Sequence, residues 1–137
     1  MTEPIWIQLA AVFQFHSLSI AEFGGSLGIR DTGVIESALF RPRNILEYGQ
    51  PDLFDLAAAY TAGINQNHGF IDGNKRTAFI TGAIFLLRNG YRVEAEQAEV
   101  VAAMLSLADH TIDEAGYALW LRDHSAPVDS LLDPWNA

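Results

Sequence analysis

Residues 68–87 read HGFIDGNKRTAFITGAIFLL, and this stretch determines most of what the chain can be. A polar loop rich in glycine precedes an apolar run, Ala78–Leu87, which predicts a helix. The chain has one lysine, Lys75, and it lies in this stretch beside Arg76, although the formal net charge is −9. The N–H groups at a helix start attract anions, and adjacent cations strengthen that attraction. The stretch therefore predicts a phosphate-binding helix start.

Two side chains in this loop are candidates for chemistry. His68 could take a proton from an attacking hydroxyl, or it could be a loop histidine bonded to the backbone. Asp72 could bind Mg²⁺, which prefers one or two carboxylates together with phosphate oxygens. It could equally cap the following helix, as Asp commonly does. Taken singly, each residue leaves both interpretations open.

The residues that follow are candidates for the anion site. Gly73 and Asn74 allow a tight turn that opens backbone N–H groups, although simple turn chemistry explains them too. Lys75 and Arg76 can bind phosphates. The alternative is that both are solvated in the first helical turn, but cations there oppose the helix dipole and a bound anion would offset this. Phe70 is expected to pack in the core and fix the loop.

Composition restricts the class of protein. A chain of 137 residues, half of them hydrophobic, predicts one domain with a proper core. Cysteine is absent, which excludes disulfides and thiolate chemistry. The acidic balance argues against direct nucleic-acid binding and suits a basic partner segment. Residues 1–4 lack a basic secretory start, and the longest apolar run is about half a membrane span, so we expect a cytoplasmic protein without membrane contact.

The pattern along the chain is helical almost throughout, which predicts an all-α domain over residues 1–124 and a loosely packed tail over residues 125–137. The glycine-rich segment 24–33 predicts a loop or a small β-hairpin. Pro42 is expected to interrupt the second helix, and Thr111 to cap the last one through a capping box. The first two predicted helices span residues 6–23 and 31 or 32 to 40, and a short helix then runs up to residue 48. The others are 52–67, the apolar helix after the motif, which ends at 89–90, and the helices 97–108 and 111–123.

The run His-x-Phe-x-Asp-Gly-Asn-Lys-Arg, from His68 to Arg76, resembles the signature of the Fic/Doc superfamily, in its death-on-curing (Doc) branch. Three further parts of the chain are similar to this branch: His16 before residues 23–25, the segment 52–54, and the segment 85–90. The resemblance implies a Fic fold, a helical bundle in which residues 24–33 form a flap that holds a target segment, by strand addition.

The same resemblance implies roles for the motif. His68 would be the general base, Asp72 the Mg²⁺ ligand, and Gly73, Asn74, Lys75 and Arg76 the nucleotide-binding anion hole. Members of the AMP-transferring branch have a glycine at the position of Lys75 and an arginine at the position of Phe79. Doc-branch proteins share the departure seen here, and they turn ATP around so that its γ-phosphate faces the acceptor hydroxyl.

The resemblance therefore implies a toxin that uses Mg²⁺ and ATP to phosphorylate a threonine of elongation factor Tu and so arrests translation. It also implies a small antitoxin, partly disordered, as the partner that inhibits it. AMP transfer at the same site is the first alternative, and a Fic domain that only binds a partner is the second. The added mass on a modified target, one phosphate or one AMP, separates phosphorylation from AMP transfer. The presence of both His68 and Asp72 argues against the domain that only binds a partner.

Overall fold

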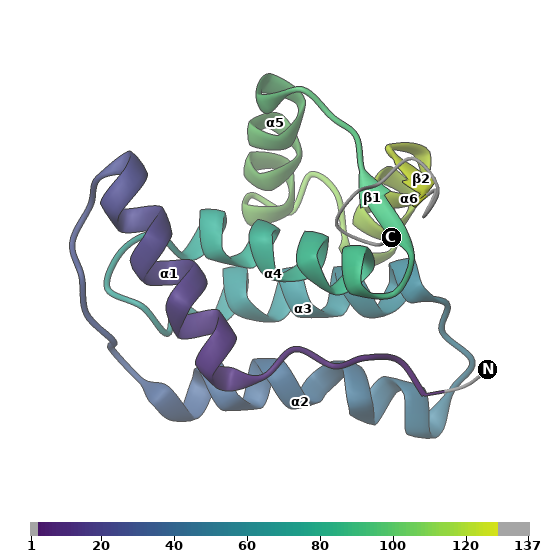
Figure 1. Cartoon of the computed structure of the whole chain (residues 1–137), viewed down its shortest axis with the longest axis horizontal. Helices are drawn as coiled ribbons and strands as arrows, with labels where there is room; N and C mark the ends of the chain where they lie inside the picture. The colour runs from purple at the N-terminus through teal and green to yellow at the C-terminus, as the bar shows by residue number, and fades with distance from the viewer. Residues whose placement is uncertain (1–2, 129–137) are drawn as a thin grey trace.

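The computed structural model describes residues 3–128, and within them it contains six helices and two short strands (Figure 1). This confirms the predicted all-α class. The elements are α1 (Leu9–Phe23), α2 (Thr32–Tyr48), α3 (Leu53–Asn67), α4 (Asn74–Arg88), β1 (Tyr91–Val93), α5 (Gln97–Ala108), α6 (Glu114–Asp123) and β2 (Ser125–Pro127). No helix among these residues has the length and apolar character that crossing a bilayer requires.

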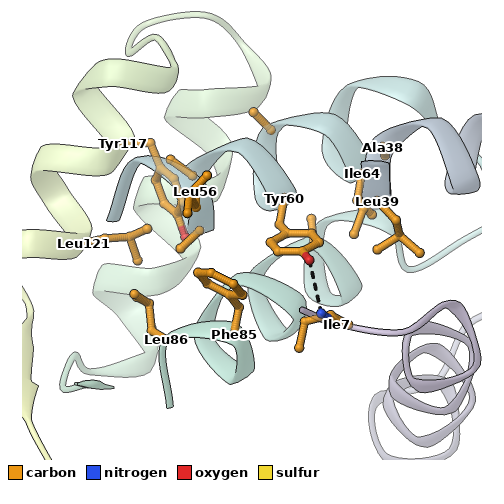
Figure 2. Close-up of a cluster of buried hydrophobic side chains, with 14 of the residues drawn as sticks. Ile7, Ala38, Leu39, Leu56, Tyr60, Ile64, Phe85, Leu86, Tyr117 and Leu121 are labelled. Carbon is orange, nitrogen blue, oxygen red and sulfur yellow. Dashed lines mark hydrogen bonds between the residues drawn. The ribbon is translucent and has the colours of Figure 1, made fainter. Parts of the chain in front are cut away.

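Helix α3 forms the centre of the fold. Its residues 56–65 are all buried, and α2, α4 and α6 pack around it. A helix that is apolar on every side is expected to be enclosed in this way. Small residues let its neighbours approach closely: a Cβ on Gly82 of α4 would collide with the Thr61 hydroxyl of α3. Figure 2 shows the core that results, with side chains of several helices meeting around Tyr60.

The first helix starts later than predicted. Residues 6–8 lie outside the helix, and α1 begins at Leu9 after an extended Gln8. Long-range bonds explain the difference. The Ile7 N–H donates to the Tyr60 hydroxyl at 3.1 Å (Figure 2), and the Ile5 N–H donates to the Asn89 side chain at 2.9 Å. These partners lie in α3 and after α4, so no local pattern could show them.

The predicted break at Pro42 is wrong, because α2 continues from Thr32 to Tyr48 with Pro42 inside it. Proline in a helix interior costs roughly 3 kcal/mol. Pro42 belongs to the buried face of α2, together with Ile35 and Leu39, and this face packs against α3. Burying one large aliphatic side chain stabilises by about 1.5–3 kcal/mol, so this packing offsets the proline.

The predicted cap of the last helix is also wrong. Helix α6 begins at Glu114, and its N-cap is Asp113, whose side chain accepts from the Gly116 N–H at 2.7 Å. Thr111 instead bonds to the Asp109 carboxylate through both its N–H and its hydroxyl. Two residues of this short segment, Thr111 and Asp113, could each cap a helix, and it is Asp113 that caps α6.

The two-stranded sheet was not predicted where it occurs. Strands β1 and β2 pair antiparallel, with Arg92 opposite Ala126. The glycine-rich segment 24–31 contributes only an isolated bridge, Ile29 to Phe70. Residues 125–127, expected to be loosely packed, thus form a strand, and residues 129–137 of the expected tail lie outside the described part of the chain. The domain boundary after residue 124 stays a prediction.

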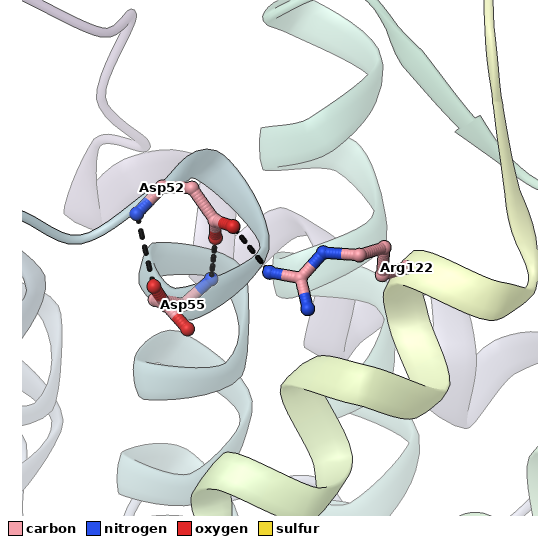
Figure 3. A network of polar contacts seen from close by, with 3 residues as sticks. All are labelled: Asp52, Asp55 and Arg122. Atoms are coloured by element: carbon pink, nitrogen blue, oxygen red, sulfur yellow. Dashed lines mark hydrogen bonds and ion pairs between the residues drawn. The ribbon is translucent and has the colours of Figure 1, made fainter.

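The start of α3 is held by a capping box (Figure 3). The Asp52 carboxylate accepts from the Asp55 N–H at 2.8 Å, and the Asp55 carboxylate accepts from the Asp52 N–H at 2.9 Å. Arg122 of α6 forms an ion pair with Asp52. Partial burial acts to raise the pKa of Asp52, but the Asp55 N–H and Arg122 outweigh it, and the pKa lies below its usual value.

Asp52→Ala is expected to lower the free energy of unfolding by about 1 kcal/mol, since an N-cap is typically worth that amount. Asp52→Asn should cost less, because asparagine still caps the helix and an exposed ion pair contributes only about 0–1 kcal/mol. Denaturant unfolding of both variants measures the difference. Equal losses would show that the ion pair to Arg122, and not the cap, accounts for the contribution.

Candidate active site

The motif loop joins the end of α3 to the start of α4, and two residues of left-handed backbone shape it. His68 is the C-cap of α3 with φ 48°, and Gly73 is the N-cap of α4 with φ 76°. Between them, Gly69 packs so closely on Ile35 that a side chain would not fit. The loop is therefore held tightly at its base, while His68 itself is exposed.

A depression of about 360 Å³ brings the predicted site residues together. All six of them line it, which means that the His68 imidazole, the Asp72 carboxylate and the start of α4 face one shared space. The lining residues are His68, Ile71, Asp72, Gly73, Asn74, Lys75 and Arg76.

The structure separates the alternatives for His68. Within the described residues 3–128, the imidazole makes no hydrogen bond, so it lacks the bond to the backbone that the structural alternative assumes. Its exposed ring lines the depression and is open to a substrate.

The structure also separates the alternatives for Asp72. The N-cap of α4 is Gly73, and no side chain caps that helix, so the interpretation of Asp72 as the cap is wrong. Its carboxylate accepts from the Ser26 N–H at 3.1 Å and from the Gly73 N–H at 2.8 Å. These two bonds hold the pKa of Asp72 below its usual value. The carboxylate is thus charged, exposed and fixed in direction, as a metal ligand requires.

The two cations differ in their surroundings. Lys75 is exposed at the start of α4 and lines the depression. Arg76 instead donates to the Gly24 carbonyl at 2.8 Å, and its guanidinium lies 5.3 Å from the centre of the Phe23 ring. Since α4 has no side-chain cap and no acidic residue in its first turn, its N-terminus keeps the character of an anion site.

Asn74 has a more structural place than its predicted role suggests. Its amide donates to the Phe70 carbonyl at 2.9 Å and accepts from the Phe70 N–H at 3.1 Å. Both polar ends of the side chain are therefore engaged, and what Asn74 offers to an anion is its backbone N–H. Phe70 is 1% exposed, which confirms the prediction that it packs in the core.

Residues 24–31 form a segment, called the flap below, that lies along the motif loop. The Arg30 and Asp31 N–H groups donate to the Gly69 carbonyl at 2.8 and 3.0 Å, and the Ile71 N–H donates to the Gly28 carbonyl at 3.2 Å. With the Ser26 bond to Asp72, the flap contacts the loop along its length. The flap backbone thus lies against the loop whose residues line the depression.

One residue of this site was given no role by the sequence. His16 of α1 is buried, its Nε2 lies 2.8 Å from the Asp72 carbonyl oxygen, and its ring stacks on Phe70. The available signal was a histidine at helical spacing between the apolar residues Val12 and Ile20. That spacing predicts a buried face but not the loop that the face contacts.

Comparison with known proteins gives a consistent result. A family model described as "Fic/DOC family" matches residues 6–86. The chain is similar to "Toxin Doc" of Mycolicibacterium smegmatis, with 42% identity over 77 residues that cover 54% of this chain and 58% of that protein. It is also similar to "Protein kinase doc" of Escherichia phage P1, with 37% identity over 79 residues that cover 57% of this chain and 63% of that protein. The matches thus span about six tenths of each relative's length.

Proposed function

The chain belongs to the Fic/DOC family, and from this premise we propose that it is a Doc-type toxin that phosphorylates a protein hydroxyl with Mg²⁺ and ATP. The observation that carries the proposal is the shared depression, which is lined by a carboxylate, a helix start without a side-chain cap at Gly73, and a histidine that makes no hydrogen bond to residues 3–128. Relatives named as a toxin and as a protein kinase support it.

The chemistry follows from where each group lies. The imidazole of His68 takes the proton of the acceptor hydroxyl as the oxygen attacks the γ-phosphorus. The new bond joins that oxygen to phosphorus, the bond from phosphorus to the β–γ bridging oxygen breaks, and ADP leaves. Lys75 and the first N–H groups of α4 hold the phosphate oxygens. Asp72 would hold Mg²⁺, which when bound neutralises phosphate charge.

The position of Phe79 supports phosphoryl transfer over AMP transfer. Phe79 is packed against the hydrophobic core and does not line the depression. The arginine that AMP-transferring members have there, for contact with a phosphate, is therefore replaced by a core side chain. Lys75 fills the position where those members have glycine, and its exposed ammonium places a charge at the helix start.

The direct test uses ATP labelled at the α or the γ position, with elongation factor Tu as the acceptor protein. We expect the γ label, and not the α label, on a threonine or serine of the acceptor. Transfer of the α label alone would make this an AMP transferase. Transfer of neither label to this acceptor, with a γ label on another cytoplasmic protein, would keep the reaction and change the target.

Lys75→Gly is expected to reduce γ-phosphate transfer and to permit some α-label transfer. The change removes the charge that holds the reversed nucleotide and opens space for a phosphate near the backbone. Lys75→Arg is the matched control, because it keeps the charge and should retain most of the kinase reaction. If Lys75→Gly keeps full γ transfer, the lysine does not select the orientation of the nucleotide.

An antitoxin segment is the proposed partner. The surface of α1 has an apolar depression of about 470 Å³ lined by Phe13, Gln14, Ser17 and Leu18, and the Leu18 side chain is 69% exposed. The apolar face of an amphipathic segment suits this groove, and basic residues elsewhere on that segment suit a chain with a formal net charge of −9. We expect such a protein, encoded beside this gene, to co-purify with the chain and to relieve toxicity.

Leu18→Asp should weaken the complex, and an unchanged complex would place the partner elsewhere.

A further inference from the structure

His16 lies on the buried face of α1, between Val12 and Ile20, and only 4% of it is exposed. A buried imidazole needs a hydrogen-bond partner, since leaving a polar group unpaired inside a protein is costly. The partner of His16 is not in its own helix. Its Nε2 lies 2.8 Å from the main-chain carbonyl oxygen of Asp72, which is 56 residues away in the sequence.

The direction of this bond follows from its chemistry. A carbonyl oxygen can only accept, so Nε2 carries the proton and donates it to Asp72. The same ring stacks on Phe70, with ring centroids 3.9 Å apart and planes 10° from parallel. The ring also lies against Gly73, whose Cβ position would be 3.6 Å from both Cδ2 and Nε2. His16 therefore contacts the motif loop at Phe70 and Asp72 and leaves little room for a side chain at position 73.

Besides the bonds from the flap, two side chains hold main-chain atoms of the loop. Asn74 holds both polar atoms of the Phe70 backbone, and His16 holds the carbonyl of Asp72. The Asp72 carboxylate is oriented by two N–H groups, but the position of its main chain depends on His16. A rotation of this peptide unit would move the carboxylate away from the phosphate site.

We propose that His16 is a positioning residue of this site, which fixes the Asp72 main chain so that the carboxylate meets the Mg²⁺ of the bound nucleotide. The proposal rests on the proposed function, because it takes Asp72 as the metal ligand. His16 touches neither nucleotide nor acceptor in this scheme and acts only through Asp72. Small displacements of such groups have large effects, and about 1 Å of misplacement can cost 10²-fold in rate.

The experiment compares two substitutions that each remove one property of the imidazole. His16→Phe keeps an aromatic ring to stack on Phe70 and removes the donor. His16→Gln keeps an N–H donor at a similar reach and removes the ring. The affinity for ATP is measured by calorimetry with and without Mg²⁺, in the absence of any acceptor protein, and thermal unfolding is recorded for each variant.

We expect His16→Phe to weaken Mg²⁺-dependent ATP binding by about 10- to 100-fold, which is typical when a group that orients a metal ligand is lost. His16→Gln should stay within about threefold of the wild type, and the KM for ATP should follow the binding affinity. A merely structural histidine would give a different result, because partial unfolding lowers the active fraction and the apparent kcat while the affinity of the folded molecules is unchanged.

The control is Phe15→Leu. Phe15 is the residue before His16 in α1, it packs against the hydrophobic core, and its side chain has no donor. It should change stability without changing Mg²⁺-dependent affinity. If His16→Phe does not fold, His16→Leu replaces it as the variant without a donor.

Wild-type affinity in the donor-less variant would overturn the positioning role, and so would an equal loss in His16→Gln. If the wild-type chain itself binds ATP with no dependence on Mg²⁺, the proposed function fails and this inference fails with it. The two failures are distinct, because the first appears only in the variants and the second appears in the unmodified protein.

Discussion

Replacing His68 with alanine is expected to lower the rate of phosphoryl transfer by about 10²–10⁴-fold, the range typical for loss of a general base. The imidazole lines the depression without any hydrogen bond in the described part of the chain, so its removal leaves the neighbouring groups in place. It is also exposed, so little packing is lost. The rate is measured with γ-labelled ATP and the acceptor protein, and growth arrest on expression provides a second measure.

The chain provides a matched control in His110. Both histidines are exposed and have left-handed backbones, with φ 48° for His68 and 64° for His110. His110→Ala should therefore have a similar effect on stability and none on the transfer rate. Growth arrest by the His68→Ala protein at equal expression would exclude His68 as the base.

The sequence predicted the parts of the fold that local chemistry controls. Glycine ended α1 at Phe23, Asp52 marked the start of α3, and α5 had the predicted bounds, because each of these signals acts within about one helical turn. The fold class followed from helical periodicity along most of the chain.

The errors occurred where distant contacts overrule local preference. Pro42 stays in a helix because its face of α2 packs on α3. Residues 6–8 stay outside α1 because the Tyr60 hydroxyl accepts from the Ile7 N–H and the Asn89 side chain accepts from the Ile5 N–H. The pairing of β1 with β2 joins segments about thirty residues apart, and neither is long enough to show a strand pattern.

The candidate site shows the same division. The six predicted residues are contiguous or nearly so, and the turn at Gly73 brings them to one depression. The groups that hold Asp72 in place come from α1 and the flap, at His16 and Ser26. Their distance along the chain, 56 and 46 residues, hides them from any pattern within the motif.

Asp72→Asn is expected to abolish the Mg²⁺ dependence of ATP binding and to reduce phosphoryl transfer by a factor comparable to the loss of His68. The variant keeps the shape of the side chain but removes the charge, and a neutral amide is a poor Mg²⁺ ligand beside phosphates. Asp72 does not cap α4, so the substitution does not remove a helix cap. The amide oxygen can still accept from one of the two N–H groups, Ser26 or Gly73, that the carboxylate now binds.

Because the side chain is exposed, the melting temperature of Asp72→Asn should change little, and this separates a loss of chemistry from a loss of fold. Asp31→Asn is the matched control, since Asp31 is an exposed carboxylate at the other end of the flap, and asparagine there still caps α2. That control removes the same charge and should leave transfer unchanged. The measurement is γ-label transfer across a Mg²⁺ titration, with excess chelator as the end point. Full transfer in chelator, or an unchanged titration in Asp72→Asn, would mean that Asp72 only fastens the flap through Ser26 and holds no metal.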